Sequence, residues 1–307
     1  HPRVRRQRQM CIRDSLSTRP IQTRDFSWDI NLNFSKNSNK VKELDGESDM
    51  FELEKASWLD VQVAAKVGEN FGSIVGPDFQ RNEKGDILID PQTGLPQYDK
   101  SNHVLGNASW DWTGGLLTNF TYKNLSLVAV FDVKVGADLY SMSARAAYES
   151  GKSPETLAGR DAWYRSEEER LAAGIAKGAD NWKPTGGFVA PGVIDNGDGT
   201  YRPNDIYINP EDYWMSVCRN APSMFIYDNS YVKCRELTLS YNVPKSWLKN
   251  VVSGLTVSFV ARNPFIVWKN IPNIDPDSNY NNTTGMGLEY GSLPSRRSYG
   301  FNVNVKF

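Results

Sequence analysis

The chain ends with Tyr299-Gly-Phe-Asn-Val-Asn-Val-Lys-Phe307, a stretch that alternates between two kinds of side chain. One face of a strand would carry Tyr299, Phe301, Val303, Val305 and Phe307. The other face would carry Gly300, Asn302, Asn304 and Lys306. This period of two is typical of a strand between an apolar and an aqueous environment. A soluble domain can contain such a strand, but ending on it with an aromatic residue is more typical of an outer-membrane β-barrel, whose last strand closes the barrel.

Length and composition agree with that prediction. The chain has 307 residues, enough for a large core or for several barrel strands. Its net charge of -1 does not indicate a nucleic-acid partner. No run reaches the roughly 18 apolar residues of a transmembrane helix, whereas alternating strands can span a membrane at a low mean hydropathy, here -0.52. The aromatic content of 12% is typical of membrane interfaces and sugar-binding surfaces.

Alternation recurs upstream and predicts an all-β chain of about seven antiparallel strands. We expect them at about 24–34, 56–68, 116–122, 125–135, 231–241, 255–261 and 299–307. The third and fourth form a tight hairpin through Lys123-Asn124. In the fifth, the apolar residues change parity near Arg235-Glu236, which predicts a β-bulge there.

The connections between these strands alternate in length. The long ones are 69–112, 137–229 and 264–297, and the shorter ones are 36–55, 123–124 and 244–254. Helices are expected at 143–150 and 158–173, within the longest connection. Transmembrane barrels have long extracellular loops and short periplasmic turns. The alternation therefore favours a transmembrane barrel.

Residues 1–18 differ from the rest of the chain. They are basic, lack periodicity and contain no apolar signal-peptide region. The segment from Arg5 to Asp14 resembles translated sequencing-adapter read-through, so we interpret 1–18 as a non-native leader and 19–307 as the barrel portion. The native N-terminus would then lie upstream. The alternative is a basic arm that binds anionic lipid or nucleic acid.

Four segments resemble the C-terminal part of the SusC/RagA family of TonB-dependent outer-membrane transporters. They are Val104–Gly115 leading into 116–140, Ser230–Trp247, Val260–Phe265 together with Asn273–Pro276, and Tyr290–Gly300 with the closing strand. The resemblance extends from about residue 19 to the end. Two departures are Cys234, where Leu is usual, and Asn263-Pro264, where Asn-Leu is usual; neither position requires a particular side chain.

The resemblance implies a fold, a location and a function. It implies the C-terminal part of a 22-stranded barrel in the outer membrane, working in TonB-energised import of oligosaccharides or, less often, peptides. It also implies a SusD-like surface lipoprotein as partner, and TonB acting through a plug domain. The plug, the TonB-contacting box and the first two-thirds of that barrel are not in this chain. The rival interpretations are a siderophore receptor, a porin, or a secreted β-rich carbohydrate-binding protein.

Aromatic residues in the 137–229 connection are the candidate ligand- or partner-facing residues: Trp163, Tyr164, Trp182, Tyr201, Tyr207, Tyr213 and Trp214. They could stack on sugar rings, form a small core within the loop, or face the partner lipoprotein.

Enzymatic chemistry, a cofactor and a metal site are not expected. The only histidines are His1 and His103, and no Ser/His/Asp set or nucleotide-binding loop is present. The segment Asp195–Thr200 is similar to part of a calcium loop but lacks the late bidentate Glu, so a turn is the better interpretation. Cys218 and Cys234 could form a disulfide or remain two separate thiols.

Overall fold

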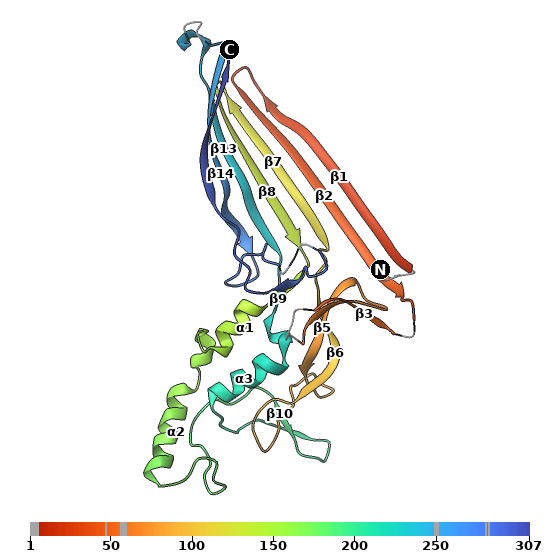
Figure 1. The fold of residues 1–307 in the computed structure, drawn as a ribbon, viewed down its shortest axis with the longest axis vertical. Helices are drawn as coiled ribbons and strands as arrows, with labels where there is room; N and C mark the ends of the chain where they lie inside the picture. The colour runs from red at the N-terminus through yellow and green to blue at the C-terminus, as the bar shows by residue number, and fades with distance from the viewer. Residues whose placement is uncertain (1–5, 47, 56–59, 249–251, 280, 282) are drawn as a thin grey trace.

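A seven-stranded antiparallel sheet dominates the computed structural model, which describes residues 6–46, 48–55, 60–248, 252–279, 281 and 283–307, with 6–11 described by their backbone alone. The strands follow one another across the sheet (Figure 1): β1 (Arg6–Gln22), β2 (Phe26–Glu43), β7 (Trp112–Tyr122), β8 (Leu125–Val135), β13 (Tyr231–Asn242), β14 (Gly254–Lys269) and β16 (Ser298–Lys306). The prediction of about seven antiparallel strands is confirmed. Strands β1 and β16 form the two edges.

Connections of different length gather at opposite ends of this sheet. The short ones, 23–25, 123–124 and 243–253, lie at one end, which we call the turn end (Figure 1). The long ones, 44–111, 136–230 and 270–297, lie at the other, which we call the mouth end. The expected alternation of short and long connections is therefore present. Two connections differ from the prediction: 23–25 and 44–111 are observed in place of 36–55 and 69–112.

The barrel strand predicted at 56–68 is wrong, as is the first part of the short connection predicted at 36–55. Strand β4 (Gln62–Lys66) belongs to a separate four-stranded sheet, and β2 continues to Glu43. Residues 56–59 of the predicted strand lie outside the described residues. The Lys- and Asn-rich end of β2 stays extended because it has partners on two sides. It pairs with β1, and Val41 N–H donates to the Glu69 carbonyl at 2.9 Å.

The strand that completes the seven is β1, which the sequence did not predict. It runs through residue 18, the predicted end of the non-native leader. It pairs with β2 from Arg6 opposite Glu43 to Gln22 opposite Ser27, with register shifts near each end. Ladder hydrogen bonds come from the backbone and require no particular side chain, so a strand can form here without marked apolar alternation. The interpretation of residues 1–18 as a non-native leader stays a prediction.

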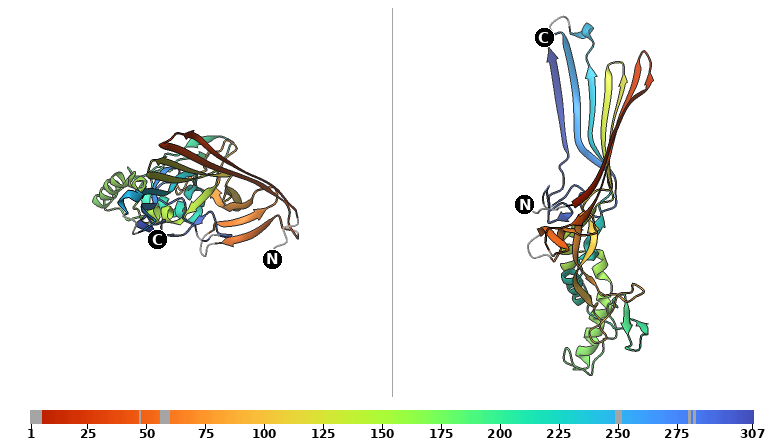
Figure 2. Two further views of the ribbon diagram at one scale, coloured as in Figure 1. Left: turned by 90° about the horizontal axis from the view of Figure 1, so that it is seen from above. Right: turned by 90° about the vertical axis from the view of Figure 1, so that its right-hand side faces the viewer.

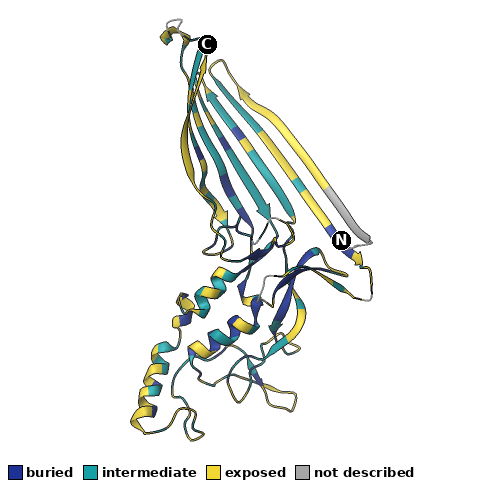
Figure 3. Cartoon of the chain, in the orientation of Figure 1, coloured by how far each residue is buried: buried dark blue, intermediate teal, exposed yellow. Residues whose placement is uncertain are grey.

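The strand registers place apolar residues beside apolar residues, and polar residues beside polar residues, on neighbouring strands. One cross-sheet row on the outer face contains Trp28, Phe120, Leu127, Leu239, Phe259 and Phe301. The adjacent row on the inner face contains Ser27, Thr121, Ser126, Ser240, Ser258 and Asn302. No other layer of the described chain covers either face along most of its length (Figures 2 and 3). The sheet thus exposes one apolar and one polar surface.

The long connections fold into what we call the loop domain, which lies end to end with the sheet (Figure 2). Its four-stranded sheet contains β3 (Met50–Lys55), β4, β5 (Phe71–Phe79) and β6 (Tyr98–Asn107). Its helices are α1 (Met142–Glu149), η1 (Pro154–Leu157), α2 (Arg160–Ala172), α3 (Pro210–Asn220) and η2 (Pro222–Phe225). Two small sheets complete it: β12 (Ile226–Asp228), β9 (Asp138–Ser141) and β15 (Leu288–Glu289), and β10 (Val193–Asp195) with β11 (Tyr201–Pro203). Both predicted helices are confirmed, as α1 and α2.

The apolar core of the described chain lies mainly in this loop domain. One cluster centres on Ile74, Tyr140 and Phe225, and a second contains Ile89 and Val217. The core therefore fixes the loop domain as a folded unit at the mouth end. Within the described part of the chain, no helix has both the length and the apolar character to cross a membrane.

Candidate functional site

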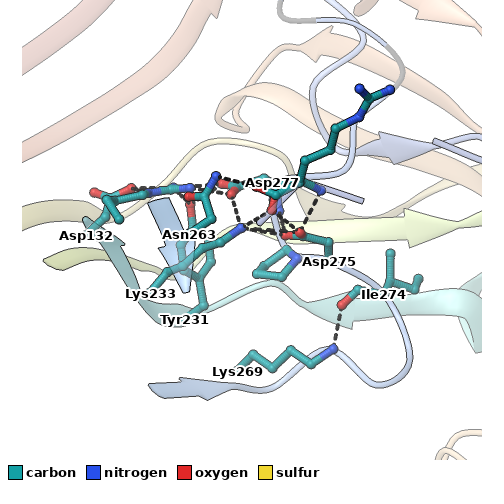
Figure 4. A network of polar contacts seen from close by, with 12 residues as sticks. Asp132, Tyr231, Lys233, Asn263, Lys269, Ile274, Asp275 and Asp277 are labelled. Carbon is teal, nitrogen blue, oxygen red and sulfur yellow. Dashed lines mark hydrogen bonds and ion pairs between the residues drawn. The ribbon is translucent and has the colours of Figure 1, made fainter. Parts of the chain in front are cut away.

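A cluster of charged side chains joins the inner face of the sheet to the connection 270–297 at the mouth end (Figure 4). We call it the neck cluster; it contains Asp132, Tyr231, Lys233, Arg235, Asp275, Asp277 and Ser295. Asp132 on β8 lies directly opposite Lys233 on β13. Alternation along β8 puts Asp132 on the inner face, but no local pattern predicts the cluster.

A β-bulge in β13 lies within this cluster, and it is confirmed where the change of parity predicted it. Both neighbouring strands shift register between Cys234 and Glu236, so Arg235 has no direct partner across either ladder. A bulged residue can redirect its side chain. Arg235 Nη2 donates to Asp132 at 2.6 Å and to Asp277 at 2.9 Å. Two cations of one strand, Lys233 and Arg235, therefore contact the same loop through Asp277.

Lys233 is the more enclosed of the two cations, with 2% of its side chain exposed. Its ammonium donates to Asp275 Oδ1 at 3.0 Å, to Asp277 Oδ2 at 2.6 Å and to Ser295 Oγ at 2.5 Å. Asp275 and Asp277 begin the 270–297 connection and Ser295 ends it. A single lysine therefore holds both arms of this loop at its neck.

Two carboxylates of the neck cluster, Asp275 and Asp277, are held in their ionised form. Burial alone would raise the pKa of Asp277, but hydrogen bonds from Arg235, Lys233 and Tyr231 outweigh it and bring the pKa well below the ordinary 3.8. The pKa of Asp275 is also lowered: burial opposes ionisation, while Ser295, the Asp277 amide and Lys233 favour it. Each depressed pKa makes folding more favourable above the unfolded value.

Acid is therefore expected to loosen the 270–297 connection. The stabilisation is fully present above about pH 4 and is lost as pH falls toward the folded-state pKa values. After correction for intrinsic rates, hydrogen exchange of the loop amides should lose about tenfold in protection between roughly pH 5 and pH 2. In Asp277→Asn, which cannot lose that charge, the change should be smaller. Constant protection in the unmodified chain would contradict this assignment.

The loop aromatics predicted as ligand- or partner-facing separate into two groups. Tyr213 and Trp214 are buried in the second apolar cluster, and their rings lie 4.9 Å apart. The other five reach the surface to different degrees: Trp163 and Trp182 partly, and Tyr164, Tyr201 and Tyr207 more fully. Tyr213 and Trp214 therefore belong to a small core within the loop. Contact with a ligand or partner stays a prediction for the other five aromatic residues.

Two cavities lie beside Trp163. One of about 210 Å³ is also lined by Tyr164 and Trp214, between α1, α2 and α3. Another of about 650 Å³ is lined by Trp163, Tyr207 and Arg219. Trp182 and Tyr201 line neither cavity. The structure thus brings four of the seven aromatics to two adjoining hollows, the feature expected of a contact surface.

The closing strand lies where the alternation predicts. Strand β16 pairs with β14 alone, leaving its other edge free within the described chain. Tyr299, Phe301, Val303 and Val305 all point to the outer face, and Phe301 is 80% exposed. An unpaired edge with exposed aromatics is a site for a further strand.

The remaining sequence candidates have local structural roles. Asp195 Oδ1 accepts from the Gly197 amide at 2.7 Å, and Asp198 Oδ1 accepts from the Thr200 amide at 2.9 Å. These carboxylates therefore cap backbone in the turn between β10 and β11. No three potential metal-ligating side chains converge among the residues described. Cys218 and Cys234 are buried free thiols.

Known proteins resemble the chain in sequence and in fold. It is 23% identical over 323 residues to the TonB-dependent receptor P3 of Formosa agariphila, covering 95% of this chain and 28% of that protein. It is 23% identical over 307 residues to the TonB-dependent receptor SusC of Bacteroides thetaiotaomicron, covering 95% of this chain and 26% of that protein. The fold matches the RagAB peptide importer in its closed-closed state with a TM-score of 0.62 and 16% identity, over 98% of this chain and 30% of that one. No family model matches. The chain thus spans little more than a quarter of these receptors.

Proposed function

We propose that this chain, whose homologues are TonB-dependent receptors, forms part of the wall and rim of a SusC/RagA-type importer in the outer membrane. The seven-stranded sheet would be a sector of the barrel wall. The loop domain would stand on the extracellular side and the short turns on the periplasmic side. The apolar outer face of the sheet carries this proposal.

That outer face suits lipid better than water. Its rows contain aromatic and aliphatic residues on every strand, and Leu239, Val257 and Phe259 remain substantially exposed. A contiguous apolar surface of this extent marks a membrane or partner interface. Aromatic pairs lie toward both ends of the face: Trp28 stacks on Phe120 near the turns, and Phe34 packs at a tilt against Trp112 near the mouth. Aromatic girdles of this kind border the hydrocarbon band of membrane barrels.

The rival classes fit less well. A secreted carbohydrate-binding module would pack its apolar faces against each other, whereas no second layer covers the outer face in the described chain (Figure 3). A porin or siderophore receptor would share the barrel wall. The SusC-type importer is favoured over the porin and the siderophore receptor because the relatives are TonB-dependent receptors that include SusC.

A SusD-like lipoprotein is the partner we propose for the loop domain, with TonB acting through a plug domain outside this chain. The partly exposed aromatics around Trp163 and Tyr207 suit such a contact, because Tyr and Trp are enriched at interfaces. The cargo would be an oligosaccharide. A peptide is the second candidate, because the matched RagAB structure is a peptide importer.

Cysteine accessibility tests the lipid-facing assignment directly. In a cysteine-free background reconstituted into lipid, Leu239→Cys should be shielded from a water-soluble maleimide. Ser240→Cys, one position along the same strand, should react at least about tenfold faster because it faces the aqueous interior. Equal reactivity at both positions, or soluble cooperative folding of the chain without detergent, would exclude the barrel.

A further inference from the structure

A cavity of about 540 Å³ lies beside the neck cluster, between β13, β14 and the 270–297 connection. Its polar lining includes Lys233, Lys269, Asn273, Asp275 and Arg297. By register, Lys233 lies opposite Ile266 and Lys269 lies opposite Tyr231, on the inner face of the sheet. The cavity therefore belongs to the polar side of the wall, away from the proposed lipid.

The charges of this lining do not balance. Three cationic side chains face one carboxylate, Asp275. Asp275 is already saturated, because it accepts from Lys233, from the Ser295 amide at 2.9 Å and from the Asp277 amide at 3.1 Å. The neighbouring Asp277 is in turn engaged by Lys233 and Arg235. The cavity thus retains the charges of Lys269 and Arg297.

Neither Lys269 nor Arg297 is neutralised by direct contact with a carboxylate of the described residues. Lys269 Nζ donates one hydrogen bond, to the Ile274 carbonyl at 2.5 Å, which leaves two of its three donors (Figure 4). The side-chain amide of Asn273 adds a donor that no described residue uses. Two cations with unused donors suit an oxyanion.

We propose that this cavity binds a sulfate or phosphate ester group of a soluble ligand, with Lys269 and Arg297 as its charge partners. At about 540 Å³ the cavity is larger than a lone oxyanion. The group is therefore carried on a larger molecule, part of which contacts Phe265, Ile266 and Pro294. This inference stands on charge and geometry and does not depend on the proposed transport function.

Protection of Lys269 from acylation tests the proposal on the full chain refolded in detergent. At constant ionic strength, inorganic sulfate and phosphate should each slow acylation of Lys269 at least fivefold relative to chloride, as read by peptide mass spectrometry. Lys269→Gln and Arg297→Gln should each weaken sulfate binding about tenfold in calorimetric titration. Arg262→Gln is the matched control, because Arg262 is exposed, pairs with Glu236 and does not line the cavity.

The outcomes separate the sources of the anion. A soluble sugar sulfate should protect Lys269, whereas vesicles that contain anionic lipid should not; protection by vesicles alone would overturn the soluble ligand. Unchanged acylation in sulfate and phosphate would overturn the site itself. Arg297→Gln is used only if its circular dichroism matches that of the unmodified chain. If it does not match, the sulfate affinity of Lys269→Gln and the acylation of Lys269 test the site. None of these results alters the alternating reactivity expected at residues 239 and 240, so the two proposals fail separately.

Discussion

Lys233→Met is expected to lower the free energy of unfolding by about 3–5 kcal/mol, the usual cost of removing one partner of a buried ion pair. The ammonium that is lost holds Asp275 and Asp277, and its side chain is almost fully enclosed. Methionine fills similar space without charge, so the loss would be electrostatic rather than steric. Denaturant unfolding of the chain in detergent, followed by circular dichroism, measures it.

Lys306→Met is the matched control for that experiment. Lys306 lies on the exposed strand β16 and forms no ion pair with a described residue. Its replacement should change stability by less than about 0.5 kcal/mol. A second variant, Lys233→Met with Asp275→Asn, should recover part of the loss because one uncompensated carboxylate is removed. Equal stability of Lys233→Met and Lys306→Met would show that the neck cluster does not hold the loop.

Trp214→Ala is expected to cost about 3–5 kcal/mol, as for large aromatic side chains removed from a core. Trp214 is 8% exposed, and its ring packs against Tyr148 at 4.7 Å and Tyr213 at 4.9 Å between centroids. The loss should appear in unfolding of the loop domain, read by tryptophan fluorescence and limited proteolysis.

Tyr164→Ala separates core packing from surface contact. Tyr164 lines the same small cavity but is 64% exposed, so its loss should change stability by less than about 0.5 kcal/mol. Any effect of Tyr164→Ala should appear instead in binding of a partner or ligand. If Trp214→Ala were as mild as Tyr164→Ala, the aromatic cluster would not be the core of the loop domain.

Local pattern predicted most of the large sheet. The hairpin of β7 and β8, the bulge at Arg235 and the closing strand β16 all follow from side-chain parity along one strand. Parity is a local property, because neighbouring residues of a strand point to opposite faces whatever their partners are. The same reasoning failed at residues 36–42, where ladder pairing with β1 and contact with the 69–71 segment keep a polar stretch extended.

The candidate site was far less predictable. Lys233, Arg235 and Asp275 lie within the segments that carry the family resemblance, and Asp277 follows directly after one of them, but nothing local marks these residues as partners. They are separated by about forty residues in sequence, and their contact depends on the loop returning across the inner face. The aromatics show the same limit, because composition could not separate the buried Tyr213 from the exposed Tyr207.

The sequence by itself determined that the sheet has one apolar and one polar face, because strand periodicity is set by backbone geometry. It also determined two of the three short reversals of chain direction, at 123–124 and at about 244–254, from turn residues and the lengths of the connections. Only the tertiary structure decided which strand occupies each place, which aromatics are core, and which charges meet at the neck. Those outcomes depend on the free energies of contacts between segments far apart in sequence, which cannot be deduced from a local pattern.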